Sequence, residues 1–538
     1  MAEAELILLL LSVVAATTLI ATRIGIPYPI LMVIAGLVLG LALSFFPDAP
    51  SVELAPETVL IFFLPPILFS AAYNLSPREL WRNIRPISLL AVGLVIATTA
   101  AVAAVAMALT PEIGWPVAIA LGAIVSPPDA IAATSIARRM NLPRRLVIIF
   151  EGESLVNDAT ALTIYRFAVA AVVAGGTFDL GGASIGFFGV ALGGILIGTV
   201  VGLGASRLLA LLEEPPVEVL ITLLIPFVAF LPAEALGVSG VLATVTAGLI
   251  GGWRAPRVMG SDTRLLGTAT WKMVIFVVNG LAFLLVGLQL RTVAQSVEGA
   301  SGAELLGAGA LISLTVIVIR LVWVYPATYL PRWLIPSLAR RDPAPPARVP
   351  LILGWGGMRG AVTLAAALAL PLRTAAGDPF PGRDAVIFLA FSVVLVTLIG
   401  QGLTLPALIR ALGVEDDGSL EHEEVHARRA ATDAALERIE EMRAEVPGHL
   451  PLLDQLKERY EHREEHLVHE HGDELDGALA DELTPEQVEE LEHDEIRRSV
   501  ISAERIAVLD LRDRGEITDD TLRRIERDLD LDELRREA

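Results

Sequence analysis

The chain has 538 residues, of which 54% are hydrophobic and 19% are charged, and its mean hydropathy is +0.62. This composition is typical of a protein that crosses a membrane many times. The net charge of −21, without any basic stripe, excludes a nucleic-acid-binding protein, and the absence of cysteine excludes disulfides and thiolate metal sites.

Apolar segments recur from the first residues to about Arg410 and then stop. Glu3 and Glu5 stand where a signal peptide would carry positive charge, so the first apolar run is predicted to be a retained span. We predict a transmembrane domain over residues 1–414 and a soluble domain over residues 415–538. Thirteen candidate spans begin near residues 4, 27, 57, 86, 115, 146, 184, 216, 236, 265, 304, 349 and 384.

Arginines gather in the loops on one side of these predicted spans, and acidic residues prevail in the loops on the other side. Because positively charged loops remain in the cytoplasm, this pattern predicts a multi-pass protein of the cell membrane with its N-terminus outside and its tail inside. The arginine-rich loops contain Arg23, Arg78, Arg82, Arg85, Arg138, Arg139, Arg144, Arg145, Arg207, Arg254, Arg257, Arg332, Arg340, Arg341 and Arg348.

The fifth and twelfth spans carry sequences that break helices. Ser126-Pro127-Pro128-Asp129 removes two backbone donors in the middle of the fifth span, which leaves carbonyls free beside a carboxylate. Gly354 to Gly360 places four glycines around Arg359 in the twelfth. Broken helices at matching positions predict an all-α protein of two inverted six-helix repeats, joined by the seventh helix, with the site at the midplane.

The sixth span contains the string EGESLVNDATALTIYR. Helical spacing sets Glu153 over Asn157 and Ser154 over Asp158, so four polar groups are expected to gather on one side of this helix. A charged group at the centre of a bilayer costs at least a few kcal/mol, so these groups must meet partners, water or a cation inside the bundle. The string therefore predicts an ion or proton site.

A purely structural network is the alternative for these buried charges. Arg359 alone would face three carboxylates, Asp129, Glu153 and Asp158, and would leave two of them uncompensated. Cations or protons would have to supply the balance, which favours ion translocation.

Other charged residues receive no role in this site. Arg166 lies two turns beyond Asp158 without an evident partner, and Lys272 is expected to extend its amine toward the cytoplasmic interface. All eight histidines lie in the acidic tail, which is predicted to form amphipathic helices. The tail match to H-E-x-x-H at residues 422–426 is interpreted as chance, and His462, His466 and His469 could sense pH, bind a metal or simply face solvent.

The membrane part resembles the cation:proton antiporter-1 family, the sodium/proton exchangers that include the NhaP-like bacterial antiporters. The resemblance rests on Asp129 in the broken fifth helix, on Glu153-Ser154 and Asn157-Asp158 in the sixth, and on Gly357-Met358-Arg359-Gly360 in the twelfth. Two positions depart from the family pattern: Pro128 replaces a threonine, and Ser70 stands where many relatives have an acidic residue.

The resemblance implies a transporter without cofactor, rather than an enzyme, that exchanges sodium for protons by alternating access as a homodimer in the lipid bilayer. A proton and a cation would compete for Asp158, and Asp129, Ser154 and Asn157, supported by Ser126, would complete an oxygen-rich site. Glu153 and Arg359 would form a structural ion pair. Because Asn157 cannot titrate, we expect electroneutral exchange. Potassium/proton or mixed-cation exchange remains an alternative, as does a membrane sensor of ions and pH that transports nothing.

Overall fold

A computed structural model describes residues 2–24, 26–44, 56–175, 180–289 and 302–414, together with a few residues between 436 and 461. The chain divides into two units, residues 1–417 and 418–538. In the described part of the first unit all regular structure is helical, apart from one isolated bridge between Arg373 and Pro379. Most residues of the helices predicted for the tail lie outside the described ranges, as do all eight histidines.

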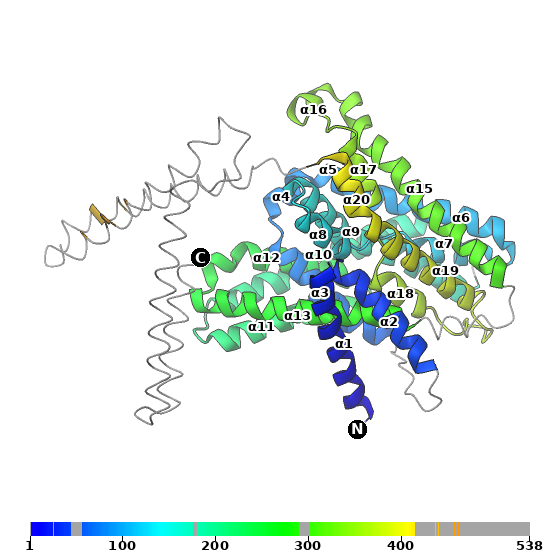
Figure 1. Cartoon of the computed structure of the whole chain (residues 1–538), viewed down its shortest axis with the longest axis horizontal. Coiled ribbons are helices and arrows are strands. Elements are labelled where there is room, and N and C mark those ends of the chain that lie inside the picture. Colours follow the sequence, from blue (N-terminus) through cyan, green and yellow to red (C-terminus); the bar gives the residue numbers. More distant parts are fainter. Residues whose placement is uncertain are drawn as a thin grey trace. The chain divides into compact units, whose positions relative to one another are not determined.

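The helices of the first unit follow one another along the chain (Figure 1). Their bounds are α1 Ala2–Ile24, α2 Tyr28–Ser44, α3 Pro56–Asn74, α4 Pro77–Arg82, α5 Ile84–Ser88, α6 Val95–Leu109, α7 Gly114–Val125, α8 Ala130–Arg139, α9 Arg144–Val173, α10 Leu180–Leu209, α11 Pro215–Ala235, α12 Gly240–Val258, α13 Ser261–Leu288, α15 Gly302–Leu334, α16 Pro336–Arg341, α17 Arg348–Trp355, α18 Ala361–Leu368, α19 Arg383–Leu395 and α20 Gly402–Leu412. Two π-helical segments, Leu89–Leu94 and Val396–Gln401, join α5 to α6 and α19 to α20.

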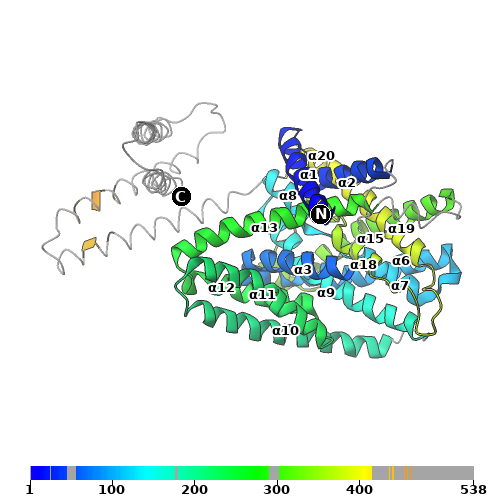
Figure 2. The ribbon, with the colours of Figure 1, turned by 90° about the horizontal axis from the view of Figure 1, so that it is seen from below.

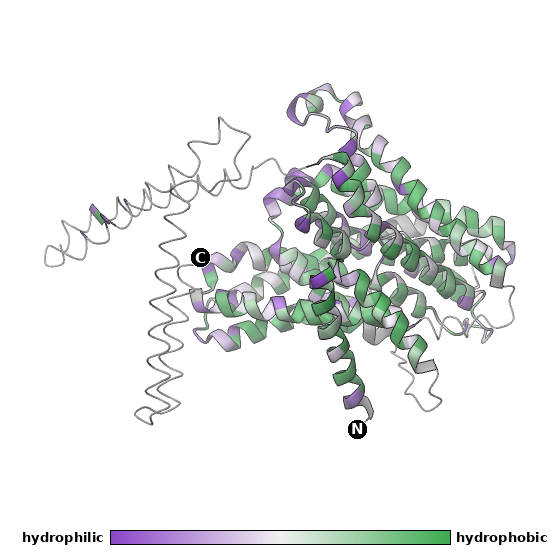
Figure 3. Cartoon of the chain, in the orientation of Figure 1, coloured by the Kyte–Doolittle hydropathy of each residue, from purple (hydrophilic) through white to green (hydrophobic). Residues whose placement is uncertain are grey.

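Nine helical stretches in the described ranges are long and apolar enough to cross a membrane. The other four predicted spans correspond to α2 and α3, which are shorter, to α12, and to the interrupted pair α17 and α18. Hydrophobic residues run along outward-lying helices such as α15, whereas hydrophilic residues gather at α4 and α16 (Figure 3). A polytopic helical membrane protein is thus confirmed, and the two inverted repeats stay a prediction.

The helices pack as two groups. Helices α1, α2, α3 and α10 to α13 pack mainly on one another, and we call them the α13 group. Helices α4 to α9 and α15 to α20 form the α9 group. Figures 1 and 2 both show α10 to α13 side by side, away from α6, α7, α15 and α19. The hydrophobic cluster with the most residues among those described lies between α6, α7, α9, α15 and α19, and α2 and α13 also contribute to it.

The predicted break in the fifth span lies between α7, which ends at Val125, and α8, which begins at Ala130. Pro127 and Pro128 have no N–H group to continue the α7 ladder. Asp129 then starts α8, because its side-chain Oδ1 accepts the N–H of Ile131 at 2.8 Å and so caps the new helix. The chain resumes a helix within four residues of leaving one.

The predicted break in the twelfth span separates α17, which ends at Trp355, from α18, which begins at Ala361. The two breaks touch, since the N–H of Asp129 donates to the carbonyl of Met358 at 2.7 Å. Gly360 permits this approach: a Cβ at that position would lie 1.7 Å from Oδ2 of Asp129. The crossing of two broken helices therefore brings Asp129 against the backbone of the twelfth span.

Candidate cation-binding site

Asp129 and Asp158 line one cavity of about 950 Å³ between the two helix groups. Asp129 is placed there by the break before α8, and Asp158 lies midway along α9, where it is 6% exposed. The two carboxylates are 29 residues apart in the sequence, and the crossing of α8 and α9 brings them to the same space. Both belong to the α9 group, while much of the opposite wall comes from α3 and α13.

The cavity opens toward the arginine-rich ends of the helices. Its lining from α9 runs from Glu151 to Asp158, its lining from α11 is Val219 and Thr222, and its lining from α12 runs from Gly252 to Pro256. No lining residue among the described ones comes from the opposite halves of these three helices. On these three helices the cavity therefore extends from Asp158 toward the arginine-rich end.

The four polar groups predicted on one side of α9 occupy two neighbouring sides instead. Ser154 and Asp158 face the cavity, whereas Glu153 and Asn157 are buried and lie outside its lining. Successive residues on a helix point about 100° apart, so adjacent members of the string diverge. Ser154 and Asp158 are thus available to a cation, and the other two support the wall.

Asn157 and Ser126 hold the broken helix in place. Nδ2 of Asn157 donates to the carbonyl of Pro128 at 3.0 Å and so ties α9 to the break, while Oδ1 has no hydrogen-bond partner. The hydroxyl of Ser126 donates to the carbonyl of Ala123 at 3.0 Å and does not reach the cavity. Both side chains position Asp129 indirectly, through backbone that precedes it.

The predicted ion pair between Glu153 and Arg359 is wrong. Arg359 is fully buried and donates from Nε to the carbonyl of Val125 at 3.0 Å and from Nη2 to that of Ser126 at 3.2 Å. It also donates to the carbonyl of Gly357. The carbonyls of Val125 and Ser126, at the end of α7, have no N–H donor from a following helical turn. A cation is favoured there, because the end of a helix carries the negative end of its dipole. Arg359 therefore caps the first half of the broken fifth span.

Glu153 pairs with Arg320 of α15. Both guanidinium Nη atoms donate to its two carboxylate oxygens, the Nη2 bond measuring 2.9 Å, and both side chains are buried. Nε and Nη2 of Arg320 also donate to the carbonyl of Leu353, near the end of α17, at 3.2 and 3.0 Å. Each broken span thus has an arginine on the carbonyls of its first half.

Arg320 is a functional residue that the sequence reasoning missed. A signal was present, because Arg320 is the one charged residue in the apolar run from Leu311 to Tyr325, and an intramembrane charge indicates a buried partner. Arg320 changes the expected charge balance, because two buried arginines, Arg320 and Arg359, accompany Asp129, Glu153 and Asp158. Glu153 is neutralised by Arg320, whereas Asp129 and Asp158 form no ion pair with another described residue.

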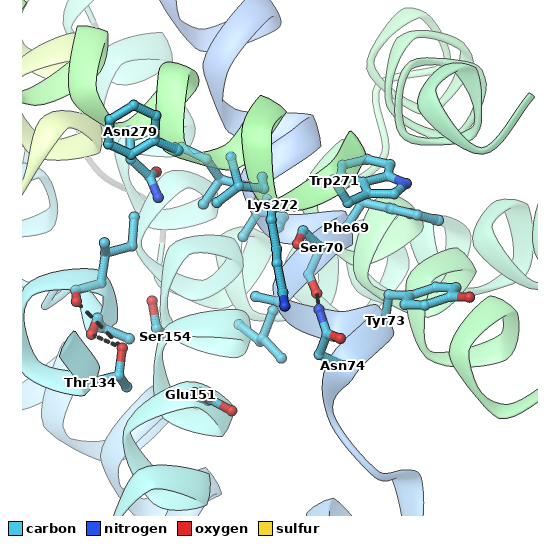
Figure 4. Close-up of a pocket in the computed structure, with 18 of the residues that line it drawn as sticks. Phe69, Ser70, Tyr73, Asn74, Thr134, Glu151, Ser154, Trp271, Lys272 and Asn279 are labelled. Carbon is cyan, nitrogen blue, oxygen red and sulfur yellow. Dashed lines mark hydrogen bonds between the residues drawn. The ribbon is translucent and has the colours of Figure 1, made fainter. Parts of the chain in front are cut away.

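Several further polar groups line the cavity (Figure 4). Ser70 and Thr134 face it from α3 and α8, and Asn279 faces it from α13 with its Oδ1 lacking a partner. Lys272 extends its amine into the cavity (Figure 4).

Arg166, for which the sequence offered no partner, forms an ion pair with Glu234 near the end of α11. Oε1 of Glu234 also accepts the N–H of Gly240 at 3.0 Å. This contact joins α9 to the α13 group on the side opposite the cavity opening. The described residues contain no cluster of three or more histidine or acidic side chains that could hold a metal ion.

The comparisons with known proteins point to one family. The profile of the family described as "Sodium/hydrogen exchanger, transmembrane" matches residues 8–411. The chain is 35% identical to an uncharacterized Na⁺/H⁺ exchanger of Mycobacterium tuberculosis H37Rv, over 98% of this chain and 95% of that protein. It is 35% identical to the Na⁺/H⁺ antiporter ApNhaP of Aphanothece halophytica, over 76% of this chain and 75% of that protein.

Two further similarities concern selectivity and fold. The chain is 32% identical to a sodium, potassium, lithium and rubidium/H⁺ antiporter of Bacillus pumilus, over 82% of this chain and 67% of that protein. The sodium proton antiporter MjNhaP1 of Methanocaldococcus jannaschii, solved at pH 8, matches with a TM-score of 0.59 and 19% identity, over 77% of this chain and 99% of that one. This last match supports the fold.

Proposed function

The chain belongs to the sodium/hydrogen exchanger family, and from that membership we propose that it exchanges sodium ions for protons across the cell membrane by alternating access. The family consists of transporters. Sodium and protons are the transported substrates, and no cofactor enters the proposal.

The observation that carries this proposal is the one-sided cavity that ends at Asp129 and Asp158. Alternating access requires a site near the middle of the bilayer that communicates with one side at a time. Asp158 lies midway along a helix of 30 residues, and the cavity lining comes from one end of α9, α11 and α12. By the charge of its loops we assign that end, and the tail of residues 415–538, to the cytoplasm, so the structure is inward-facing.

The proposed roles follow from which side chains reach the cavity. Asp158 is the carboxylate for which a proton and a sodium ion compete, and Asp129 and Ser154 add oxygen ligands of the kind that hard cations prefer. Asn157 positions the break by donating to the carbonyl of Pro128, and Ser126 supports the end of α7 by donating to the carbonyl of Ala123. Two contacts hold the broken helices in place. Arg320 binds Glu153 of α9 and a carbonyl of α17, and Arg359 binds the carbonyls at the end of α7.

We propose that exchange is electroneutral, with one proton per sodium ion. The amide of Asn157 cannot carry a titrating proton, and it donates to the carbonyl of Pro128. Glu153 is neutralised by Arg320. Asp158 is then the carboxylate that alternates between proton and cation, and Asp129 remains a ligand.

The second candidate is exchange of several alkali cations for protons. The similarity to the Bacillus pumilus protein, whose name includes potassium, lithium and rubidium, favours it. The same carboxylates would serve, since oxygen ligands bind all of these ions and selectivity depends on the size and rigidity of the shell.

Proteoliposomes containing the purified protein and a pH-sensitive dye would test both candidates. Sodium added outside should alkalinise the lumen, because each sodium ion that enters is exchanged for a proton that leaves, and protein-free liposomes serve as the control. Equal responses to sodium, potassium and rubidium would favour the second candidate. A valinomycin potential of 100 mV biases a transported net charge by about 2.3 kcal/mol, so an exchange equilibrium that moves with voltage would overturn electroneutrality.

A further inference from the structure

A third carboxylate lines the cavity between its opening and the proposed site. Glu151 lies on α9 one turn before Ser154 and two turns before Asp158, on the same side of the helix. At 1.5 Å per residue it is displaced by about 10 Å from Asp158 along the helix axis. Figure 4 shows Glu151 and Ser154 on the same helix at the cavity wall.

An ion pair at the cavity opening holds Glu151. Nη2 of Arg138, at the end of α8, donates to Oε1 of Glu151 at 2.7 Å. The Arg138 side chain is 68% exposed and that of Glu151 is 17% exposed, so solvent reaches the pair. Solvent-exposed ion pairs stabilise proteins by about 0–1 kcal/mol, and another cation can therefore replace Arg138 at small cost.

The charges around Glu151 come from both helix groups. Asp129, Asp158 and Glu151 supply three carboxylates, and Arg138, Arg264 and Lys272 supply three cations. Arg264 donates to the carbonyl of Met259 at 2.6 Å, which fixes its guanidinium at the junction between α12 and α13. Lys272 projects from the opposite wall and makes no ion pair with the described residues. Among the described residues that line the cavity, Glu151 is thus the carboxylate that lies between the opening and Asp158.

We propose that Glu151 is a cation-recruiting residue of the transport path and that Arg138 competes with the entering sodium ion for the Glu151 carboxylate. A sodium ion that enters from the arginine-rich side displaces Arg138 from the Glu151 carboxylate and moves on, past Ser154, to Asp158. A carboxylate at the opening of a low-dielectric cavity raises the local concentration of cations and speeds their arrival. This inference rests on the proposed sodium/proton exchange.

Two substitutions of opposite expected effect test the inference. In inside-out membrane vesicles at low ionic strength, Glu151→Gln should raise the KM for sodium about two- to tenfold, because one unit charge at roughly 10 Å is removed. Arg138→Gln should lower the KM, because it frees the Glu151 carboxylate. Both shifts should shrink in about 1 M of an inert salt, where charges are screened within roughly 3 Å.

The matched control is Glu79→Gln. Glu79 forms an ion pair with Arg144 at 2.8 Å, is similarly exposed and lies outside the cavity lining. Its KM should equal that of the wild type. Should Glu151→Gln fold poorly, Glu151→Asp replaces it, with a smaller increase of the KM expected from the retained charge.

A merely structural ion pair predicts a different pattern. Both substitutions would then lower thermal stability and change the KM in the same direction or not at all, and either result would overturn the inference. Absence of exchange by the wild-type protein would instead overturn the proposed function. Opposite shifts of the KM that vanish with salt are the result expected for a recruiting carboxylate.

Discussion

At the residue scale, the site separates side chains that reach the cavity from side chains that build its wall. Asp129, Ser154 and Asp158 present oxygen atoms to the cavity, whereas Glu153 and Arg320 lie buried behind it. Adjacent residues of α9 therefore have different roles: Ser154 faces the cavity, whereas Glu153 is buried in its wall. Substitutions in the first set should alter transport, and those in the second should alter stability first.

Asp158→Asn should abolish sodium/proton exchange and leave folding intact. Asparagine has nearly the same volume as aspartate but can neither release a proton nor offer a charged ligand to sodium. Dye-monitored exchange in proteoliposomes measures the first effect, and a thermal melt in detergent measures the second. Asp384→Asn, at an exposed carboxylate near the start of α19, is the matched control and should transport normally. Ordinary exchange by Asp158→Asn would remove Asp158 from its proposed role.

Removing one partner of the Glu153–Arg320 pair should destabilise the protein by about 3–5 kcal/mol, because the remaining charge stays buried without compensation. Glu153→Gln combined with Arg320→Met should therefore cost less than the sum of the two single substitutions. A double-mutant cycle of thermal or denaturant stability measures this coupling. The parallel cycle of Glu153 with Arg359 is the control and should show a smaller coupling energy, and the opposite ranking would restore the pairing predicted from the sequence.

How much of the site the sequence could predict depends on the kind of information each residue carries. Asp129 and Asp158 stand out because a carboxylate inside an apolar span requires an explanation. The partner of Glu153 could not be deduced, because Arg320 and Arg359 are both isolated arginines in apolar spans and the sequence does not say which one α9 meets. That choice depends on how α15 and α17 pack, over a separation of 167 residues between Glu153 and Arg320.

At the element scale, proline and glycine allowed both broken helices to be predicted, because they act locally on the backbone. The means by which the breaks are stabilised is tertiary and could not be predicted. Arg359 reaches from the twelfth span to the carbonyls of α7, and Arg320 reaches from α15 to a carbonyl of α17. The direction of each side chain depends on neighbouring helices and leaves no periodic trace in the sequence.

Asp342 joins three elements at the arginine-rich end. Its carboxylate accepts from Arg85 at 2.6 Å, from Arg145 at 2.9 Å and from Arg332 at 2.8 Å, and these arginines belong to α5, α9 and α15. Burial by itself raises the pKa of Asp342, but the hydrogen bonds and charges of Arg145 and Arg332 outweigh it and lower the pKa to about 2. The three helices are thus fastened by one ionised carboxylate.

Asp342→Asn should lower the free energy of unfolding at neutral pH by about 1–2 kcal/mol. Because the pKa is lower in the folded state, this contribution is fully present above about pH 4, the ordinary value for aspartate, and is lost as the pH falls toward 2. Thermal melts of wild type and variant in detergent between pH 7 and pH 2.5 measure the difference. A gap between the two proteins that stays constant down to the lowest pH would contradict this assignment, and Asp262→Asn, at the exposed start of α13, is the control.

At the scale of the whole molecule, the two helix groups meet differently at their two ends. At the arginine-rich end the cavity separates α9 from α13, and at the other end Arg166 of α9 is paired with Glu234 of α11. Exchange by alternating access requires the cavity to close at the first end and a path to open at the second. That change requires the Arg166–Glu234 contact to break.

Covalent linkage at this contact should therefore stop exchange. The chain contains no cysteine, so Arg166→Cys combined with Glu234→Cys introduces the only two thiols. Bridging them with a short, reducible thiol cross-linker should abolish exchange in proteoliposomes, and a reductant should restore it. Each single substitution treated with the same reagent is the control. Full exchange by the bridged protein would show that the two groups do not separate at this end.

The three charged groups that mark the opening, the site and the far contact all lie on α9, at Glu151, Asp158 and Arg166. This helix runs without interruption for 30 residues, about 45 Å, while its neighbours α7–α8 and α17–α18 are broken. Because one stiff rod carries all three groups, its two ends cannot shift independently against the α13 group. We therefore expect the movement that frees Arg166 also to shut the cavity at Glu151. Under alternating access, this coupling would disfavour a state that is open at both ends and through which the membrane gradient would leak.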